Sequence, residues 1–207
     1  MRASPVLLIA ILALPAYGQD LECNGEIKVT FESASGNSEE TTFQGVHISD
    51  CTHDIIGARA STQVHESGRK TWHLEGEVRL TFGATVIDAD SAVFEFEPDE
   101  LQRDQLVNAE LIGRPVRMSD FDATRNTAFS GTADSIYVDS RNTTLRLLGQ
   151  ATLFRGTNER EGFEGCDWIY NWGDHSFSAG TTECGGIILR LARPENRNAP
   201  DPQPASP

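Results

Sequence analysis

The stretch that decides the fold runs from Trp72 to Phe96 and reads WHLEGEVRLTFGATVIDADSAVFEF. One face of its first half carries Trp72, Leu74, Gly76, Val78, Leu80 and Phe82. This period of two residues is typical of a β-strand with one buried face. The alternation restarts after Gly83, slips by one residue at Asp90 and resumes with Ala92. Because a slip would turn a straight strand's apolar side chains outward, we expect a bulge or corner at Asp90 that keeps both halves facing inward.

The same pattern recurs further along the chain. Residues 145–153 repeat the alternation, and further slips follow Ala133 and Gly165. Such recurrence indicates a repeat architecture. The unequal spacing of the strand-centre glycines favours stacked, V-shaped strand pairs over a tight solenoid.

Other strands are predicted at 26–31, 42–49, 55–64 and 187–192, with two short strands within 106–118. Residues 32–40 are polar and predicted as a loop. Pro115 lacks a backbone donor and predicts a break or an edge. No helix is expected after residue 18.

The N-terminus predicts an exported protein. Residues 6–14 are apolar and follow a single Arg2, and Ala16-Tyr17-Gly18 matches the cleavage pattern of a secretory signal peptide. We expect residues 1–18 to be the signal peptide, 19–193 one β-domain and 194–207 a disordered Pro-rich tail. The alternative is an uncleaved membrane anchor, for which the apolar run is short.

Composition and the absence of known motifs argue against several classes of function. The net charge of −14 at pH 7 argues against a nucleic-acid partner, which would need clustered Lys and Arg. The five histidines are scattered, and the sequence has no nucleophile elbow or phosphate loop. Asp88, Asp90, Asp134 and Asp139 lie at predicted corners, where aspartate commonly hydrogen-bonds the backbone. We therefore predict no catalytic residue, no metal and no cofactor.

The four cysteines are Cys23, Cys51, Cys166 and Cys184. Behind an export signal they indicate an oxidising compartment. Four cysteines allow three pairings, and closeness in sequence favours Cys23–Cys51 and Cys166–Cys184. A zinc site at Cys51-Thr52-His53 is the weaker alternative, because no second close pair of ligands accompanies it.

Six segments follow one another in a recognisable order: LEGEVRL (74–80), IDADSAVF (87–94), AELIGRPVRM (109–118), FSGTADSIYVD (129–139), LRLLGQATL (145–153) and FEGCDWIYNWGDHSFSA (163–179). This series, from about residue 42 to 194, resembles the periplasmic lipopolysaccharide-transport proteins of the LptA/OstA family. The resemblance implies an all-β fold, an open β-jellyroll of stacked, V-shaped antiparallel strands. The four cysteines and the segment 20–41 depart from the family pattern.

The resemblance also implies a non-enzymatic function in the periplasm. In that family an apolar groove carries the acyl chains of lipopolysaccharide from the inner to the outer membrane. The implied partners are lipopolysaccharide and other jellyroll proteins of the bridge, joined by edge-strand pairing. Head-to-tail self-association is a further expectation.

The inward face of the strands supplies the predicted groove. Its residues are Trp72, Leu74, Val78, Leu80, Phe82, Ile87, Phe94, Phe96, Leu111, Val116, Met118, Phe129, Ile136, Val138, Leu145, Leu147, Leu153, Phe163, Trp168 and Tyr170. Burial of acyl chains contributes roughly 0.8 kcal/mol per CH₂, so several chains need a long apolar trough. An ordinary closed core is the alternative, since periodicity alone does not distinguish the two. Glycines 76, 113, 131, 149 and 165 share this face, and we favour bends over ligand space as their role.

Three other functions stay open. A membrane-tethered, LptC-like partner of the same pathway would share the jellyroll and keep its N-terminal helix. A secreted structural β-protein would have a closed core and bind no lipid. A hydrolase comes last, because the sequence shows no polar constellation for it.

Overall fold

The computed structural model describes residues 26–36, 41–156, 161–179 and 188–191. The predicted signal peptide and Pro-rich tail lie outside these residues. The described residues form one antiparallel sheet of twelve strands and contain no helix. In this part of the chain there is accordingly no helix long and apolar enough to cross a membrane.

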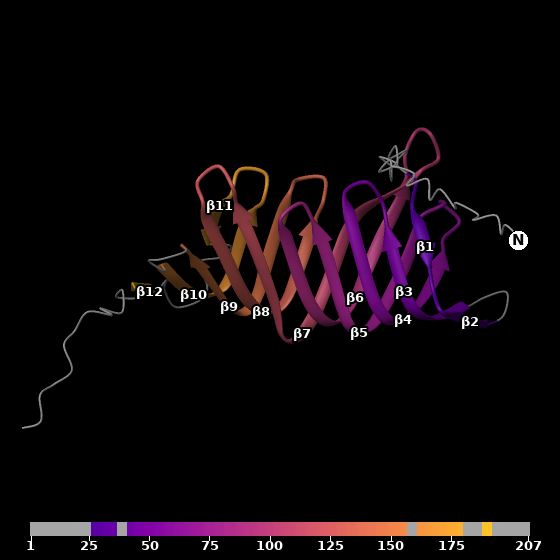
Figure 1. Cartoon of the computed structure of the whole chain (residues 1–207), viewed down its shortest axis with the longest axis horizontal. Helices are drawn as coiled ribbons and strands as arrows, with labels where there is room; N and C mark the ends of the chain where they lie inside the picture. Colours follow the sequence, from indigo (N-terminus) through magenta and orange to yellow (C-terminus); the bar gives the residue numbers. More distant parts are fainter. Residues whose placement is uncertain (1–25, 37–40, 157–160, 180–187, 192–207) are drawn as a thin grey trace, which may run out of the picture.

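The strands in chain order are β1 (Lys28–Thr30), β2 (Ser33–Gly36), β3 (Thr41–Ser49), β4 (His53–Val64), β5 (Lys70–Phe82), β6 (Thr85–Pro98), β7 (Asp104–Asp122), β8 (Thr127–Asp139), β9 (Thr144–Arg155), β10 (Glu161–Asn171), β11 (Ser176–Ala179) and β12 (Ile188–Leu191). From β3 to β11 each strand pairs with the next one along the chain. The strands therefore follow one another in a row, from β1 and β2 at one end to β11 and β12 at the other (Figure 1).

The long strands are bent near their middles. The pairing register shifts at Ile56/Arg59, Glu75/Val78, Asp88/Ser91, Ile112/Val116, Thr132/Ser135 and Gly165/Asp167. These irregularities follow one line across the sheet and divide each strand into two legs. The predicted corner at Asp90 and the slips after Ala133 and Gly165 are confirmed, and so is the open β-jellyroll of V-shaped antiparallel strands.

Two glycines on this line have a backbone conformation that favours glycine. Gly76 and Gly149 have φ angles of 76° and 89°, which an L-residue adopts only with strain. A Cβ on Gly149 would also lie 2.3 Å from Asp134 Oδ2. These two glycines support the predicted role in bends. Gly131 differs, because a Cβ there would lie 2.8 Å from Leu147 Cδ2 inside the core.

Two local predictions are wrong, and a third is correct only in part. The segment predicted as two short strands within 106–118 is part of the single strand β7, and Pro115 sits in its bulge, where the ladder is interrupted. Residues 33–36, predicted as loop, form β2 against β3. All four β2 residues are exposed, so an apolar alternation could not reveal the strand. The predicted first strand, 26–31, is reduced to β1.

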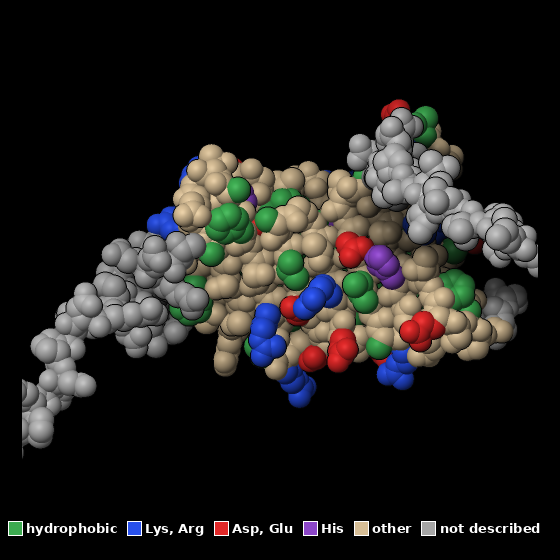
Figure 2. Space-filling view, viewed as in Figure 1, with side chains coloured by type: hydrophobic (Ala, Val, Ile, Leu, Met, Phe, Trp, Pro, Cys, Tyr) green, Lys and Arg blue, Asp and Glu red, His purple; other side chains and the backbone are tan. Residues whose placement is uncertain are grey.

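The outer surface is polar and mixed in charge. On the face seen in Figure 2, acidic and basic side chains lie close together, and hydrophobic ones are scattered. Exposed ion pairs join neighbouring strands, such as Arg79 Nε with Asp88 Oδ1 at 2.7 Å and Arg59 with Glu75 at 3.2 Å. Such pairs contribute little stability in water. The apolar side chains instead face the interior of the V.

Candidate lipid-binding interior and its mouth

The two legs of each strand lie beside those of its neighbours and form two walls around an apolar interior. Every predicted groove side chain that the structure describes is buried and belongs to one hydrophobic cluster. Their exposed fractions run from 0% for Phe94 and Leu147 to 8% for Trp72. Nothing is described of the Phe163 side chain. The interior is thus filled by the protein's own side chains, and acyl-chain contact by these residues stays a prediction.

The cluster contains further residues that sequence reasoning left out. They are Val46, Ile48, Ile55, Ala60, Ala89, Ala92, Leu106, Ala109, Ala133 and Ala151. Val46, Ile48 and Ile55 come from β3 and β4. Both strands were predicted, but their side chains were not assigned to a face. The apolar interior therefore begins earlier in the chain than predicted.

The two walls end at two sets of hairpin turns. Because successive strands run in opposite directions, every second turn belongs to the same wall. The first wall ends in turns 50–52, 83–84 and 123–126. The second wall ends in turns 65–69, 99–103, 140–143 and 172–175. We call the gap between these two sets of turns the mouth.

Two adjoining hollows lie in the mouth. One has a volume of about 410 Å³ and the other about 750 Å³. Both are lined by His53 from the first wall and Ser140 from the second. The larger hollow reaches Phe82 and Trp172, and the smaller one Leu106. Phe82 and Leu106 belong to the buried cluster, so the mouth leads directly to the apolar interior.

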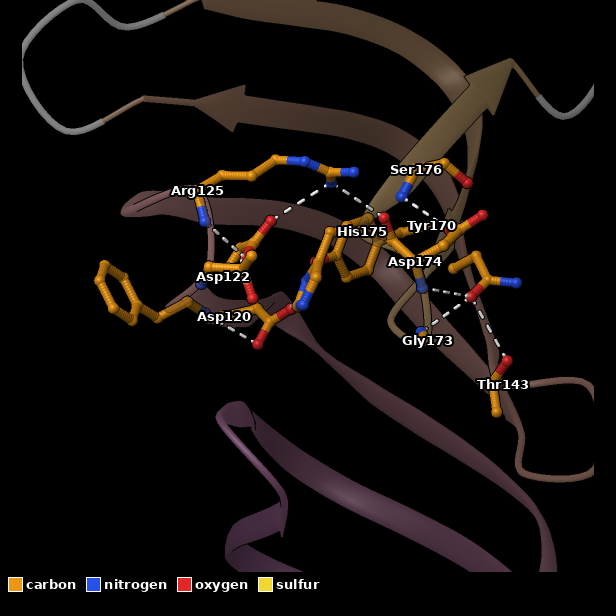
Figure 3. Close-up of polar contacts among 12 residues, drawn as sticks. Asp120, Asp122, Arg125, Thr143, Tyr170, Gly173, Asp174, His175 and Ser176 are labelled. Atoms are coloured by element: carbon orange, nitrogen blue, oxygen red, sulfur yellow. Dashed lines mark hydrogen bonds and ion pairs between the residues drawn. The ribbon is translucent and has the colours of Figure 1, made fainter.

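A polar cluster joins the two walls at one end of the larger hollow (Figure 3). Asp120 comes from β7 on the first wall, whereas Tyr170 and His175 come from β10 and the β10–β11 turn on the second. The Tyr170 hydroxyl donates to Asp120 Oδ2. His175 Nδ1 lies 3.0 Å from the same Oδ2 and 2.8 Å from the Tyr170 hydroxyl oxygen. We call Asp120, Tyr170 and His175 the clasp.

Two of the three clasp residues are buried. Asp120 is 5% exposed and Tyr170 0%. Burial raises the pKa of Tyr170 above its usual value, and the hydrogen bond to Asp120 raises that pKa further. The hydroxyl therefore stays protonated and can donate to the carboxylate throughout the physiological range. A buried carboxylate that accepts hydrogen bonds avoids most of the cost of desolvation.

A second acidic residue, at the next inward position of β7, holds the turn beside the clasp. Asp122 is 2% exposed, and its Oδ1 accepts hydrogen bonds from the backbone N–H groups of Arg125 at 3.0 Å and Thr124 at 2.9 Å. The bond from Arg125 is the main cause of a lowered Asp122 pKa. Arg125 Nη1 also reaches the Asp174 carbonyl oxygen at 3.1 Å, which is a further contact between the walls.

Aromatic contacts also cross the mouth. The Phe82 ring of the first wall lies 4.7 Å from the Trp172 ring of the second, centroid to centroid. Phe129 of β8 stacks on His175, with centroids 5.9 Å apart and an interplanar angle of 13°. Such ring pairs contribute beyond their buried area. The mouth is therefore held by polar and aromatic contacts together.

Sequence reasoning missed this cluster although a signal was present. The inward alternation of Val116 and Met118 continues through Asp120 and Asp122. In this part of the chain the predicted groove ends at Met118 and does not include the two aspartates. Tyr170 was correctly placed on the inward face, but its partner is 50 residues away in sequence. Extending the period-two register into polar residues would have placed both carboxylates at the mouth.

Cys51 lies in the turn before β4. Cys51 is disulfide-bonded, and no cysteine among the described residues is free. The zinc alternative at Cys51-Thr52-His53 is wrong, because a disulfide sulfur is not a thiolate ligand. The pairings Cys23–Cys51 and Cys166–Cys184 stay predictions, because Cys23, Cys184 and the Cys166 side chain lie outside what the structure describes.

The aspartates predicted at corners bind backbone or side-chain donors. Asp90 Oδ2 accepts from the Arg114 N–H at 3.1 Å, and Asp134 Oδ2 from the Gln150 N–H at 3.2 Å. Both bonds span the line of bulges, where ladder pairing is interrupted. Asp88 pairs with an arginine on the outer face, and Asp139 caps the β8–β9 turn. Within the described ranges no three His, Cys, Asp or Glu side chains gather in a way that could hold a metal ion.

One open sheet of V-shaped strands around an apolar interior makes this protein an open β-jellyroll. Residues 58–172, more than half of the chain, match the family described as "LptA/(LptD N-terminal domain) LPS transport protein". The chain therefore belongs to this family of lipopolysaccharide-transport proteins.

Individual relatives are more distant. No curated protein sequence matches the chain. Among solved structures it is similar to LptH from Pseudomonas aeruginosa, described as the LptA homologous periplasmic component of the lipopolysaccharide transport device. The two share 14% identity with a TM-score of 0.49, over 83% of this chain and 98% of that one.

Proposed function

We propose that this protein is a periplasmic, non-enzymatic carrier that holds the acyl chains of lipopolysaccharide between its two walls. Membership of the lipopolysaccharide-transport family carries the proposal. The continuous apolar cluster supports it, because burial of acyl chains contributes roughly 0.8 kcal/mol per CH₂. Transport direction and energy would come from other proteins, since the sequence has no phosphate loop.

The interior must open to accept an acyl chain, and the pairing of the strands permits this. Among the described strands, backbone pairing runs along each wall and none joins the walls across the mouth. Parting the walls therefore breaks side-chain contacts and leaves the ladders intact. The line of bulges is the natural hinge, because it already interrupts the ladders.

The proposed location is the periplasm. The predicted signal peptide, residues 1–18, would direct export. The disulfide at Cys51 supports an oxidising compartment, since disulfides rarely persist in the cytosol. Sequencing the N-terminus of the exported protein tests cleavage after Gly18 and distinguishes this carrier from a membrane-tethered partner.

The proposed partners join at the two ends of the sheet. β1 and β2 form one end and β12 lies at the other, so each end offers a strand edge for pairing with another jellyroll. A row of such proteins would form the bridge from inner to outer membrane. β12, at the position of the predicted last strand, pairs with β10 opposite residues 161–164.

A photo-crosslinking pair tests lipopolysaccharide binding. A benzoylphenylalanine in place of Phe82 would lie at the interior side of the mouth, whereas one in place of Arg79 would lie on the outer face of the same strand. Arg79 is 55% exposed at its side chain and Phe82 is 5% exposed. We expect lipopolysaccharide adducts from the Phe82 position and few from the Arg79 position after irradiation in intact cells.

Mass spectrometry of lipids co-purified with the periplasmic protein provides an independent readout. Lipid A fragments should accompany the wild-type protein. Equal crosslinking from both positions would show nonspecific contact, and absence of adducts from both, with no co-purified lipid A, would contradict the proposal.

A further inference from the structure

The walls are held together unevenly along the mouth. At one end the clasp, the contact of Arg125 with the Asp174 carbonyl and the ring pair Phe82–Trp172 connect them. Beside these contacts lie the two hollows of about 410 and 750 Å³. Asp120 and His175 themselves line the larger hollow. A group that enters this hollow from solvent therefore contacts two residues of the clasp.

The clasp joins strands that have no other direct pairing. β7 pairs with β6 and β8, and β10 pairs with β9, β11 and β12. Its bonds therefore add nothing to the ladders. When the walls part, water can replace each partner, so the carboxylate of Asp120 and the hydroxyl of Tyr170 are not left buried and unpaired. The clasp thus stabilises the closed mouth far more than it stabilises the strands.

We propose that Asp120, Tyr170 and His175 are gating residues, whose hydrogen bonds set how often the mouth opens and how fast an amphiphile with acyl chains enters the interior. This inference rests on the proposed carrier function. It extends that function by assigning control of acyl-chain uptake to three named side chains at one end of the mouth.

The clasp is also suited to reversible opening. Its hydrogen bonds involve a carboxylate, and such bonds are stronger than neutral ones. They involve only three side chains, however, and His175 keeps 23% of its side chain exposed. His175 lies in the left-handed region with φ 54°, so the turn itself presents the ring to Asp120. Closure thus needs no rearrangement of the strands.

The test compares Tyr170→Phe with a matched control, Thr132→Val. Tyr170→Phe keeps the ring that packs 5.3 Å from Phe129 and removes only the hydroxyl. Thr132→Val is nearly isosteric and removes a side-chain hydrogen bond of 2.7 Å to Thr152, which lies within one wall. Tyr170→Phe loses the hydrogen bonds of the hydroxyl with Asp120 and His175, and the bond with Asp120 crosses the mouth. Thr132→Val loses one hydrogen bond, and that bond lies within a wall.

Two probes are mixed with the purified full-length protein in stopped flow: fluorescently labelled lipopolysaccharide and the apolar dye N-phenyl-1-naphthylamine. We expect uptake of both probes to be about tenfold faster in Tyr170→Phe, which corresponds to about 1.4 kcal/mol. Thr132→Val should match the wild type. Amide hydrogen exchange should also accelerate at 118–122 and 170–171 in Tyr170→Phe, with no lipid present.

The outcomes separate the two proposals. Equal uptake and equal exchange in Tyr170→Phe and Thr132→Val would overturn the clasp, even if the wild type binds lipopolysaccharide. A wild type that never binds lipopolysaccharide, with faster dye uptake in Tyr170→Phe, would overturn the carrier function and leave the clasp in place.

A second variant guards against misfolding. His175→Asn removes the imidazole and keeps a residue that tolerates the left-handed region. It should accelerate dye uptake in the same direction, and wild-type uptake and exchange in this folded variant would exclude His175 from the clasp.

Discussion

At the scale of single residues, Asp50 shows how one carboxylate secures the turn at the mouth. Its Oδ1 accepts hydrogen bonds of 2.6 Å from the backbone N–H groups of Thr52 and His53, and its Oδ2 lies 3.1 Å from His53 Nδ1. Burial alone would raise the pKa of Asp50, but the hydrogen bonds outweigh burial and lower this pKa to about 2. The turn that carries the Cys51 disulfide thus depends on an ionised Asp50.

The lowered pKa predicts how stability depends on pH. Because the pKa of Asp50 is lower in the folded state than the ordinary value of 3.8, its ionisation stabilises the fold above about pH 4. That stabilisation is lost as the pH falls toward about 2. Between about pH 4 and about pH 2, the free energy of unfolding of the wild type should fall more than that of Asp50→Asn, by about 1–2 kcal/mol after allowance for solvent screening. Urea denaturation at each pH measures both values. The control is Glu100→Gln, which removes an exposed carboxylate in the β6–β7 turn. Parallel pH curves for the wild type and Asp50→Asn would contradict the assignment.

The same scale shows what the sequence could predict about the site. Alternation placed every described groove residue on the inward face, because burial of one strand face leaves a direct mark on the sequence. It did not reveal the clasp, because Asp120 is polar. Its partners His175 and Tyr170 lie on the opposite wall, and only the folded arrangement of the two walls brings them close to Asp120. A contact over 50 residues depends on the twist and bend of the whole sheet, which no local pattern records.

At the scale of strands, the sequence predicted three of the six register shifts that form the line of bulges. Each slip of one residue in the alternation became a register shift, as at Asp90 and Ala133. The reason is that a slip can keep its apolar side chains buried only where the strand bends. The weakest prediction concerns β2. β2 is an edge strand with exposed residues, so backbone pairing alone defines it.

Gly149 tests how much the bend depends on close approach. Its φ of 89° strains any L-residue, and a Cβ would lie 2.3 Å from Asp134 Oδ2. Moving that carboxylate would break its hydrogen bond with the Gln150 N–H. Gly149→Ala should therefore lower the unfolding free energy by about 2–3 kcal/mol, measured by urea denaturation.

The control for Gly149→Ala is Gly83→Ala. Gly83 also has a positive φ, 56°, but apart from its two chain neighbours no residue has an atom within 4 Å of an added Cβ. Gly83→Ala should lower the unfolding free energy by only about 1 kcal/mol, which is the effect of backbone strain alone. Equal losses in both variants would mean that the approach of Asp134 to the bend contributes no strain.

At the scale of the whole molecule, the apolar interior does not stop at the last buried residue. A series of ring contacts runs from the buried Trp72 through Phe43 to Phe31, with centroid distances of 5.4 and 5.0 Å. Phe31 is 47% exposed and lies in the chain between β1 and β2. These two strands are at one end of the sheet (Figure 1). Among the described residues, this end of the molecule therefore presents both a strand edge without a pairing partner and an exposed apolar ring.

A second jellyroll docked on this end would extend the sheet and bury Phe31, so that two interiors become continuous. Phe31→Asp would place a charge in that junction, where it would lack a partner and be costly to desolvate. We expect the wild-type mass, measured by light scattering, to rise with protein concentration, and Phe31→Asp to stay monomeric. The variant should remain folded by circular dichroism, because the ring is already half exposed. Leu101→Asp, at a 70% exposed position in the β6–β7 turn, should associate like the wild type. If the wild type stays monomeric at high concentration, self-association is wrong. If Phe31→Asp associates normally, the contact lies elsewhere on the molecule.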